Sequence, residues 1–87
     1  MIPIKYSLVI EATDDPLFFA FYSPELEGFT GVGSSIEDCI YKAIHGIEEH
    51  LNLLKEKGLS IPPEPEEPRI VVVNAKEQGR VKTAVTA

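Results

Sequence analysis

The chain has 87 residues, 44% of them hydrophobic and 25% charged, which is enough for one domain with one modest core. Eight basic residues stand against fourteen acidic ones, a net charge of −6 that disfavours a nucleic-acid surface and favours a basic protein partner. No apolar run approaches the ~20 residues that cross a membrane, and no leader pattern is seen at the N-terminus. The single cysteine, Cys39, excludes an internal disulfide and suits a reducing cytoplasm.

The first third of the chain predicts three strands separated by turns. Residues 4–11 alternate with a period of two, as in a half-buried strand: one face carries Ile4, Tyr6, Leu8 and Ile10, and the other carries Lys5, Ser7, Val9 and Glu11. Asp14, Asp15 and Pro16 are then expected to form a turn. A second strand over residues 17–22 is apolar on both faces: Leu17, Phe19 and Phe21 on one, Phe18, Ala20 and Tyr22 on the other. A connection over residues 23–28 leads to a short third strand over residues 29–32.

A long helix is predicted over residues 36–57. Seven apolar residues recur at three- and four-residue spacing on one stripe: Ile36, Ile40, Ala43, Ile44, Ile47, Leu51 and Leu54. Ser34 and Ser35 precede acids by three residues in a capping-box pattern, and Gly58 with the prolines beyond it ends the helix. Gly46, at the edge of the stripe, costs about 1 kcal/mol of helix propensity, so we expect a close approach there to the sheet or to a second subunit.

The proline-rich segment 60–68 allows two interpretations. It fits a ligand for a proline-binding domain, and it fits better a stiff linker that brings the chain back after a helix longer than the strands. Four consecutive apolar residues within 69–73 then predict a fourth strand that is buried on both sides. Residues 74–87 form a C-terminal tail that frays or adds an edge strand over residues 81–85.

These elements predict an α+β fold of the form β-β-β-α-β. Three antiparallel strands followed by a crossover helix place the fourth strand parallel to the first, in the order 3-2-1-4. One helix covers one face, so the other face would be an apolar patch larger than a monomer normally exposes. We expect a second copy in a homodimer or tetramer, a partner protein, or the tail to cover it.

Three stretches carry a family resemblance: residues 6–11, residues 19–28 with their aromatic-x-aromatic and Pro-Glu-Leu-Glu-Gly pattern, and residues 30–38 opening the helix. In this order they resemble the HicB-like family over about residues 4–68. The resemblance implies that residues 1–73 adopt a degenerate, partial ribonuclease H-like fold. It also implies an antitoxin of a toxin–antitoxin system, which binds and masks a small basic HicA-type toxin that cleaves RNA. Many relatives continue into a DNA-binding domain. About 14 residues follow Val73, so direct DNA binding is not expected.

Catalysis is not expected from the pattern of polar residues. A two-metal nuclease needs carboxylates converging from strands and helix, and the fourth strand has none to join Glu11 and Glu48 or Glu49. His45 and His50 are about 140° apart on the helix and cannot share one ion. We therefore predict a protein that is not an enzyme, with no catalytic residue, metal or cofactor site.

The predicted function is a protein-binding module. Phe18, Ala20 and Tyr22 would carry association through the sheet, and Glu25, Glu27, Glu37 and Asp38 would select a basic partner. The alternative is a stand-alone oligomeric domain with a nucleic-acid-linked regulatory role, in which four residues of the C-terminal segment contact nucleic acid: Arg69, Lys76, Arg80 and Lys82.

Overall fold

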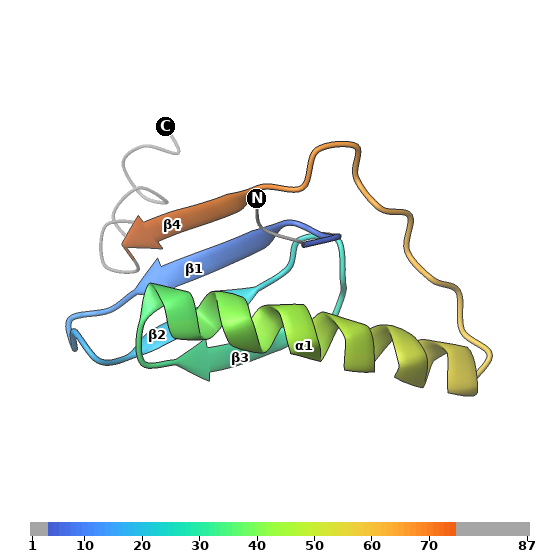
Figure 1. The fold of residues 1–87 in the computed structure, drawn as a ribbon, viewed down its shortest axis with the longest axis horizontal. Coiled ribbons are helices and arrows are strands. Elements are labelled where there is room, and N and C mark those ends of the chain that lie inside the picture. The colour runs from blue at the N-terminus through green and yellow to red at the C-terminus, as the bar shows by residue number, and fades with distance from the viewer. Residues whose placement is uncertain (1–3, 75–87) are drawn as a thin grey trace.

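The computed structural model of the chain describes residues 4–74. In chain order the elements are Leu8–Ala12 (β1), Phe19–Tyr22 (β2), Thr30–Gly33 (β3), Ile36–Glu56 (α1) and Ile70–Asn74 (β4). The strands form one sheet in the order β3-β2-β1-β4, with β1 parallel to β4 and the other neighbours antiparallel (Figure 1). The predicted α+β fold and strand order are confirmed.

β2 is shorter than the sequence predicts because the first two residues of the predicted strand are held in the preceding turn by side-chain hydrogen bonds. The Leu17 N–H donates to the Asp15 carboxylate at 2.9 Å, and the Thr13 hydroxyl donates to the Phe18 carbonyl at 2.8 Å. These side-chain bonds hold Leu17 and Phe18 in the turn between β1 and β2, where they are 72% and 44% exposed.

α1 is capped at both ends by the residues the sequence indicates. The Ser35 hydroxyl accepts from the Asp38 N–H at 3.0 Å, which satisfies one of the free donors of the first turn. At the other end Gly58 takes a positive φ of 70°, and the Leu59 N–H donates to the Leu54 carbonyl at 2.9 Å. This backbone bond is the Schellman arrangement that a C-terminal glycine permits.

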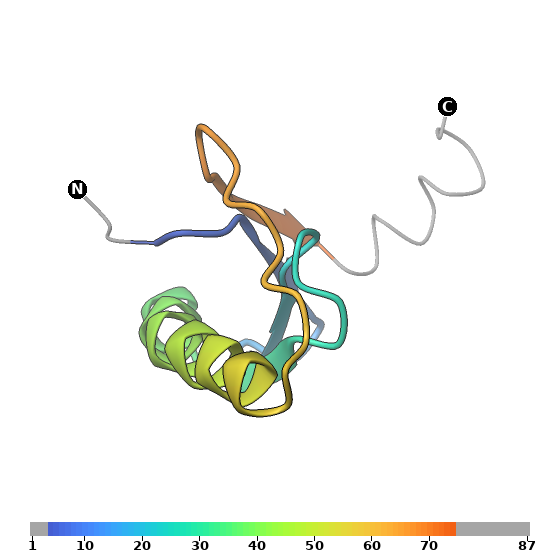
Figure 2. The same cartoon turned by 90° about the vertical axis from the view of Figure 1, so that its right-hand side faces the viewer.

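The core lies between α1 and one face of the sheet (Figure 2). Cys39, Ala43 and Ile47 of α1 are buried, and the strands contribute Leu8, Ile10 and Phe21. The residues before β1 and around β3 complete it: Tyr6, Leu26 and Phe29. Cys39 is fully buried, at 0% exposure, and is a small residue of this core.

The prediction that the fourth strand is buried on both sides is wrong. Val71 and Val72 point to opposite faces yet are 44% and 46% exposed. Val72 is exposed because α1 packs chiefly on β1, β2 and β3 and leaves β4 at the sheet edge away from the helix (Figure 2). Val71 is exposed because it lies on the face opposite α1, over which residues 4–74 place no helix or strand. An apolar run indicates a strand but not its place in the sheet.

The segment between α1 and β4 returns along the molecule, as expected from a helix that extends past the strands (Figure 1). Tyr6 anchors this segment, since its hydroxyl donates to the Pro62 carbonyl at 2.5 Å. Asn74, placed in the tail by the sequence analysis, is the last residue of β4. The prediction that residues 75–87 fray or add an edge strand lies outside the described residues.

Candidate functional site

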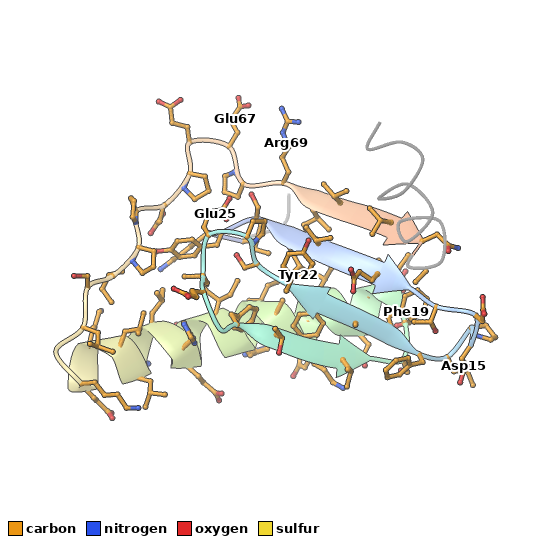
Figure 3. The ribbon with its side chains drawn as sticks, turned by 180° about the vertical axis from the view of Figure 1, so that it is seen from behind. Asp15, Phe19, Tyr22, Glu25, Glu67 and Arg69 are labelled. Atoms are coloured by element: carbon orange, nitrogen blue, oxygen red, sulfur yellow. The ribbon has the colours of Figure 1, made fainter. Side chains whose placement is uncertain are left out.

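The candidate site is the sheet face opposite α1, which we call the open face. Register places Thr30, Tyr22, Val9 and Val71 in one cross-strand row, and Val32, Ala20, Glu11 and Val73 in the next. Val32 and Val71 are 52% and 44% exposed, and the other apolar side chains of the two rows are half-buried. Within residues 4–74 no helix or strand covers this face, which Figure 3 views directly.

Two of the three residues predicted for association lie in these rows. Ala20 and Tyr22 alternate with Phe21, which is buried on the helix side, so both belong to the open face. Phe18 is exposed in the turn before β2. Val9, Val32 and Val71 also belong to this surface, which the sequence pattern does not indicate. Alternation within a strand gives two sets of residues, but only the register with its neighbours joins one set to Tyr22.

The four predicted acidic residues do not form one patch. Glu25 and Glu27 lie in the connection between β2 and β3, at the end of the sheet where β1 and β4 begin. Glu37 and Asp38 lie in the first turn of α1, which follows the opposite end. The four acids that the sequence suggests for a basic partner therefore lie at two separate sites.

Two of these acids also hold local structure. The Ser7 N–H donates to the Glu25 carboxylate at 2.7 Å, which ties the β2–β3 connection to the residues before β1. The Asp38 carboxylate accepts from the Ser34 N–H at 2.9 Å and pairs with Lys42 at 3.2 Å. The Ser34 backbone bond and the Lys42 contact lower the pKa of Asp38. Asp38 thus has a structural role, whereas Glu27 and Glu37 are exposed.

Further acids lie in the returning segment at the end of the sheet where Glu25 is found. Glu64, Glu66 and Glu67 are exposed there, and Figure 3 shows Glu67 and Arg69 extending beyond the sheet. The carboxylates of Glu64 and Glu25 also interact electrostatically with Tyr6. Burial, helped by these two carboxylates, raises the pKa of the Tyr6 phenol. The open face is therefore bordered by acids at this end and by Asp14 and Asp15 at the other.

The polar residues weighed for chemistry lie apart. His45 contacts the Tyr41 ring on the outside of α1, with 4.6 Å between centroids, and His50 contacts the Phe29 ring at 5.8 Å. Cys39 is buried, and burial raises the pKa of its thiol. Over residues 4–74 no group of three His, Cys, Asp or Glu side chains is placed to hold a metal ion.

A shallow cleft of about 330 Å³ lies between α1 and the start of β3. Phe29, Gly46, His50 and Leu53 contribute to its lining, with Glu49 at the same site. No sequence pattern indicates this cleft, because it depends on how closely the helix approaches Phe29.

Comparison of the chain with protein-family models, curated proteins and solved structures gives no significant match. The resemblance to the HicB-like family therefore stays a prediction from the sequence. None of the helices formed by residues 4–74 has the length and apolar character needed to span a membrane.

Proposed function

We propose that this domain is a non-catalytic protein-binding module that receives a small basic protein on its open face. The observation that supports this most strongly is the pair of cross-strand rows around Tyr22, in which Val32 and Val71 are exposed and no helix or strand of residues 4–74 lies above them. A largely apolar surface with a polar border is typical of interaction sites rather than of a solvated face, and Glu11 adds one carboxylate within it.

Charge supports a basic partner over a second copy on this face. Acids border both ends of the open face: Glu25, Glu27, Glu64, Glu66 and Glu67 at one, Asp14 and Asp15 at the other. Two copies stacked face to face would bring like charges together in either orientation, which opposes association. A partner with an apolar centre and a basic border would pair with the same acids and associate faster.

The family resemblance narrows this partner to a HicA-type toxin, which makes the proposed function antitoxin-like. Masking the toxin needs no catalytic group on this chain, only a surface that binds and covers the toxin's RNA-cleaving site. The open face is proposed as that surface, with Tyr22 as its central aromatic anchor.

The experiment is a titration of RNA cleavage by a purified HicA-type toxin from the same genome with the full chain. We expect inhibition that saturates near one chain per toxin. Val32→Lys places a charge in the open face and should weaken inhibition at least about tenfold. Tyr41→Lys is the matched control, because Tyr41 is 65% exposed on the outside of α1. No inhibition by the full chain, or equal effects of the two variants, would reject the proposal.

The alternative role in nucleic-acid binding depends on Arg69 and on Lys76, Arg80 and Lys82, of which the last three lie outside the described residues. Replacing those three by Gln in the full chain separates the two functions. Only the alternative predicts that nucleic-acid binding is present, falls with salt, and is lost in this variant. Toxin inhibition should be unchanged.

A further inference from the structure

β4 is an outer strand without the usual protection of a sheet edge. The order β3-β2-β1-β4 leaves one side of β4 without a neighbouring strand among residues 4–74. Natural edge strands usually carry lysine, proline or a bulge that prevents pairing with another chain. Residues Ile70–Asn74 read Ile-Val-Val-Val-Asn, which has none of these and is rich in β-branched residues.

The backbone groups on the outer side of β4 can be assigned from the pairing with β1. The Leu8 N–H donates to the Arg69 carbonyl at 2.8 Å, and Leu8 is in register with Ile70. In a parallel pair a residue bonds to the two residues that flank its register partner, so Arg69, Val71 and Val73 bond toward β1. Ile70 and Val72 therefore direct their N–H and C=O groups away from β1, toward the outer edge.

The side chains of β4 are open on both faces as well. Val71 is in register with Val9 on the open face, and Val72 is in register with Ile10 on the helix side. Val72 is nearly half exposed because α1 does not extend over β4, and Val71 is nearly half exposed because it lies on the face opposite α1. A neighbour at this edge would bury apolar side chains on two faces and satisfy backbone groups between them.

We propose that the occupant is a second copy of this chain, whose β4 pairs antiparallel with this β4 around a two-fold axis at Val72. The strand is complementary to itself in this register. Val72 faces Val72 of the other copy as a hydrogen-bonded pair, and Val71 faces Val73 twice. The two sheets become one sheet of eight strands, and the interface is isologous and closed.

The charges of the chain favour this arrangement. The acidic residues Glu64, Glu66 and Glu67 precede β4 and are exposed. Antiparallel pairing around Val72 places these acidic segments of the two copies at opposite ends of the paired strands. Their like charges are therefore kept apart, unlike in a face-to-face dimer.

This inference uses the edge of the sheet and not the open face, so it does not rest on the proposed function. The two surfaces can be tested separately, because Val72 lies on the helix side and Val32 lies on the open face. A dimer joined through β4 keeps both open faces available for a partner.

The first experiment measures the native mass of the full chain at about 10–100 µM. We expect a dimer. Val72→Pro removes an outward N–H without removing a bond to β1, and it should give a monomer with unchanged far-ultraviolet circular dichroism. Val72→Thr, which keeps the N–H and the branched shape, is the matched control and should remain dimeric. A monomeric full chain, or a folded Val72→Pro that stays dimeric, would overturn the inference.

The second experiment decides the case in which Val72→Pro does not fold. Paired Val72 positions would have Cα atoms about 5.5 Å apart, within the range of a disulfide. Val72→Cys should therefore form a covalent dimer on mild oxidation, whereas Val32→Cys should not, and Cys39 is buried and does not compete. No cross-link at position 72 would contradict the proposal and indicate that the chain's own residues 75–87 or another strand occupies the edge.

Discussion

Gly31 and Gly46 each face an aromatic ring, but the two rings differ in their freedom to move. A methyl group built on Gly31 would lie within 3.0 Å of three atoms of the Phe21 ring, which is buried against Phe29. One built on Gly46 would lie 3.0 and 3.3 Å from two atoms of Phe29, whose ring borders the open cleft. The close approach expected at Gly46 is therefore to the residue that precedes β3.

Gly31→Ala should lower the free energy of unfolding by about 1–3 kcal/mol, because the buried Phe21 ring must shift. Gly46→Ala should change it by less than about 1 kcal/mol, because a small displacement of Phe29 into the cleft offsets the gain of about 1 kcal/mol in helix propensity. Urea unfolding of both variants measures the difference. Equal losses in the two variants would show that Phe29 has no more freedom than Phe21.

Tyr6 connects the start of the sheet to the returning segment through its bond to the Pro62 carbonyl. Tyr6→Phe should lower stability by about 0.5–1.5 kcal/mol, because it leaves that carbonyl without its donor. Tyr41→Phe is the control, since Tyr41 is exposed, and should have no measurable effect. Thermal or urea unfolding at neutral pH compares them.

The same side chain predicts an alkaline limit to stability. The folded state raises the pKa of Tyr6 above its ordinary value of about 10, so the folded protein holds this proton at a pH where the unfolded chain releases it. This contribution is complete below about pH 10 and is lost as the pH rises through the folded pKa. The fall in stability above pH 10 should be shallower in Tyr6→Phe, and identical slopes would contradict this assignment.

At the scale of elements, α1 is specified by its ends as well as by its apolar stripe. Ser35→Ala should lower the free energy of unfolding by about 0.5–2 kcal/mol, because the Asp38 N–H loses its acceptor. Ser34→Ala is a close control, since that hydroxyl lies 3.4 Å from the Asp38 carboxylate and makes the weaker contact. Urea unfolding should rank Ser35→Ala as the more damaging change, and the reverse order would place the cap at Ser34.

At the scale of the whole molecule, Cys39 reports on global opening because it lies fully buried where α1 meets β3. Its thiol should react with an aromatic disulfide reagent about 10³-fold or more slowly than a free thiol, since exposure requires unfolding of the domain. The control is the double variant Tyr41→Cys with Cys39→Ala, whose single thiol is exposed and should react at the rate of a free thiol. Rapid labelling of Cys39 would show that the start of α1 opens locally.

Part of the candidate site could be predicted from sequence and part could not. Alternation along residues 17–22 placed Ala20 and Tyr22 on one face, because side-chain direction in a strand depends only on position. The joining of Val9, Val32 and Val71 to that face depends on register, and the separation of Glu25 from Asp38 depends on which end of the sheet each element reaches. Neither is encoded in a local pattern.

The sequence by itself determined the element order, the helix with its two caps, and the 3-2-1-4 topology, because these follow from periodicity, capping chemistry and the right-handed crossover. Only the tertiary structure decided that β4 is exposed on both faces. The width that one helix can cover, about 10 Å, is less than that of four strands spaced about 4.8 Å apart. α1 therefore covers β1 to β3, and among residues 4–74 no helix or strand covers the open face or the outer edge of β4.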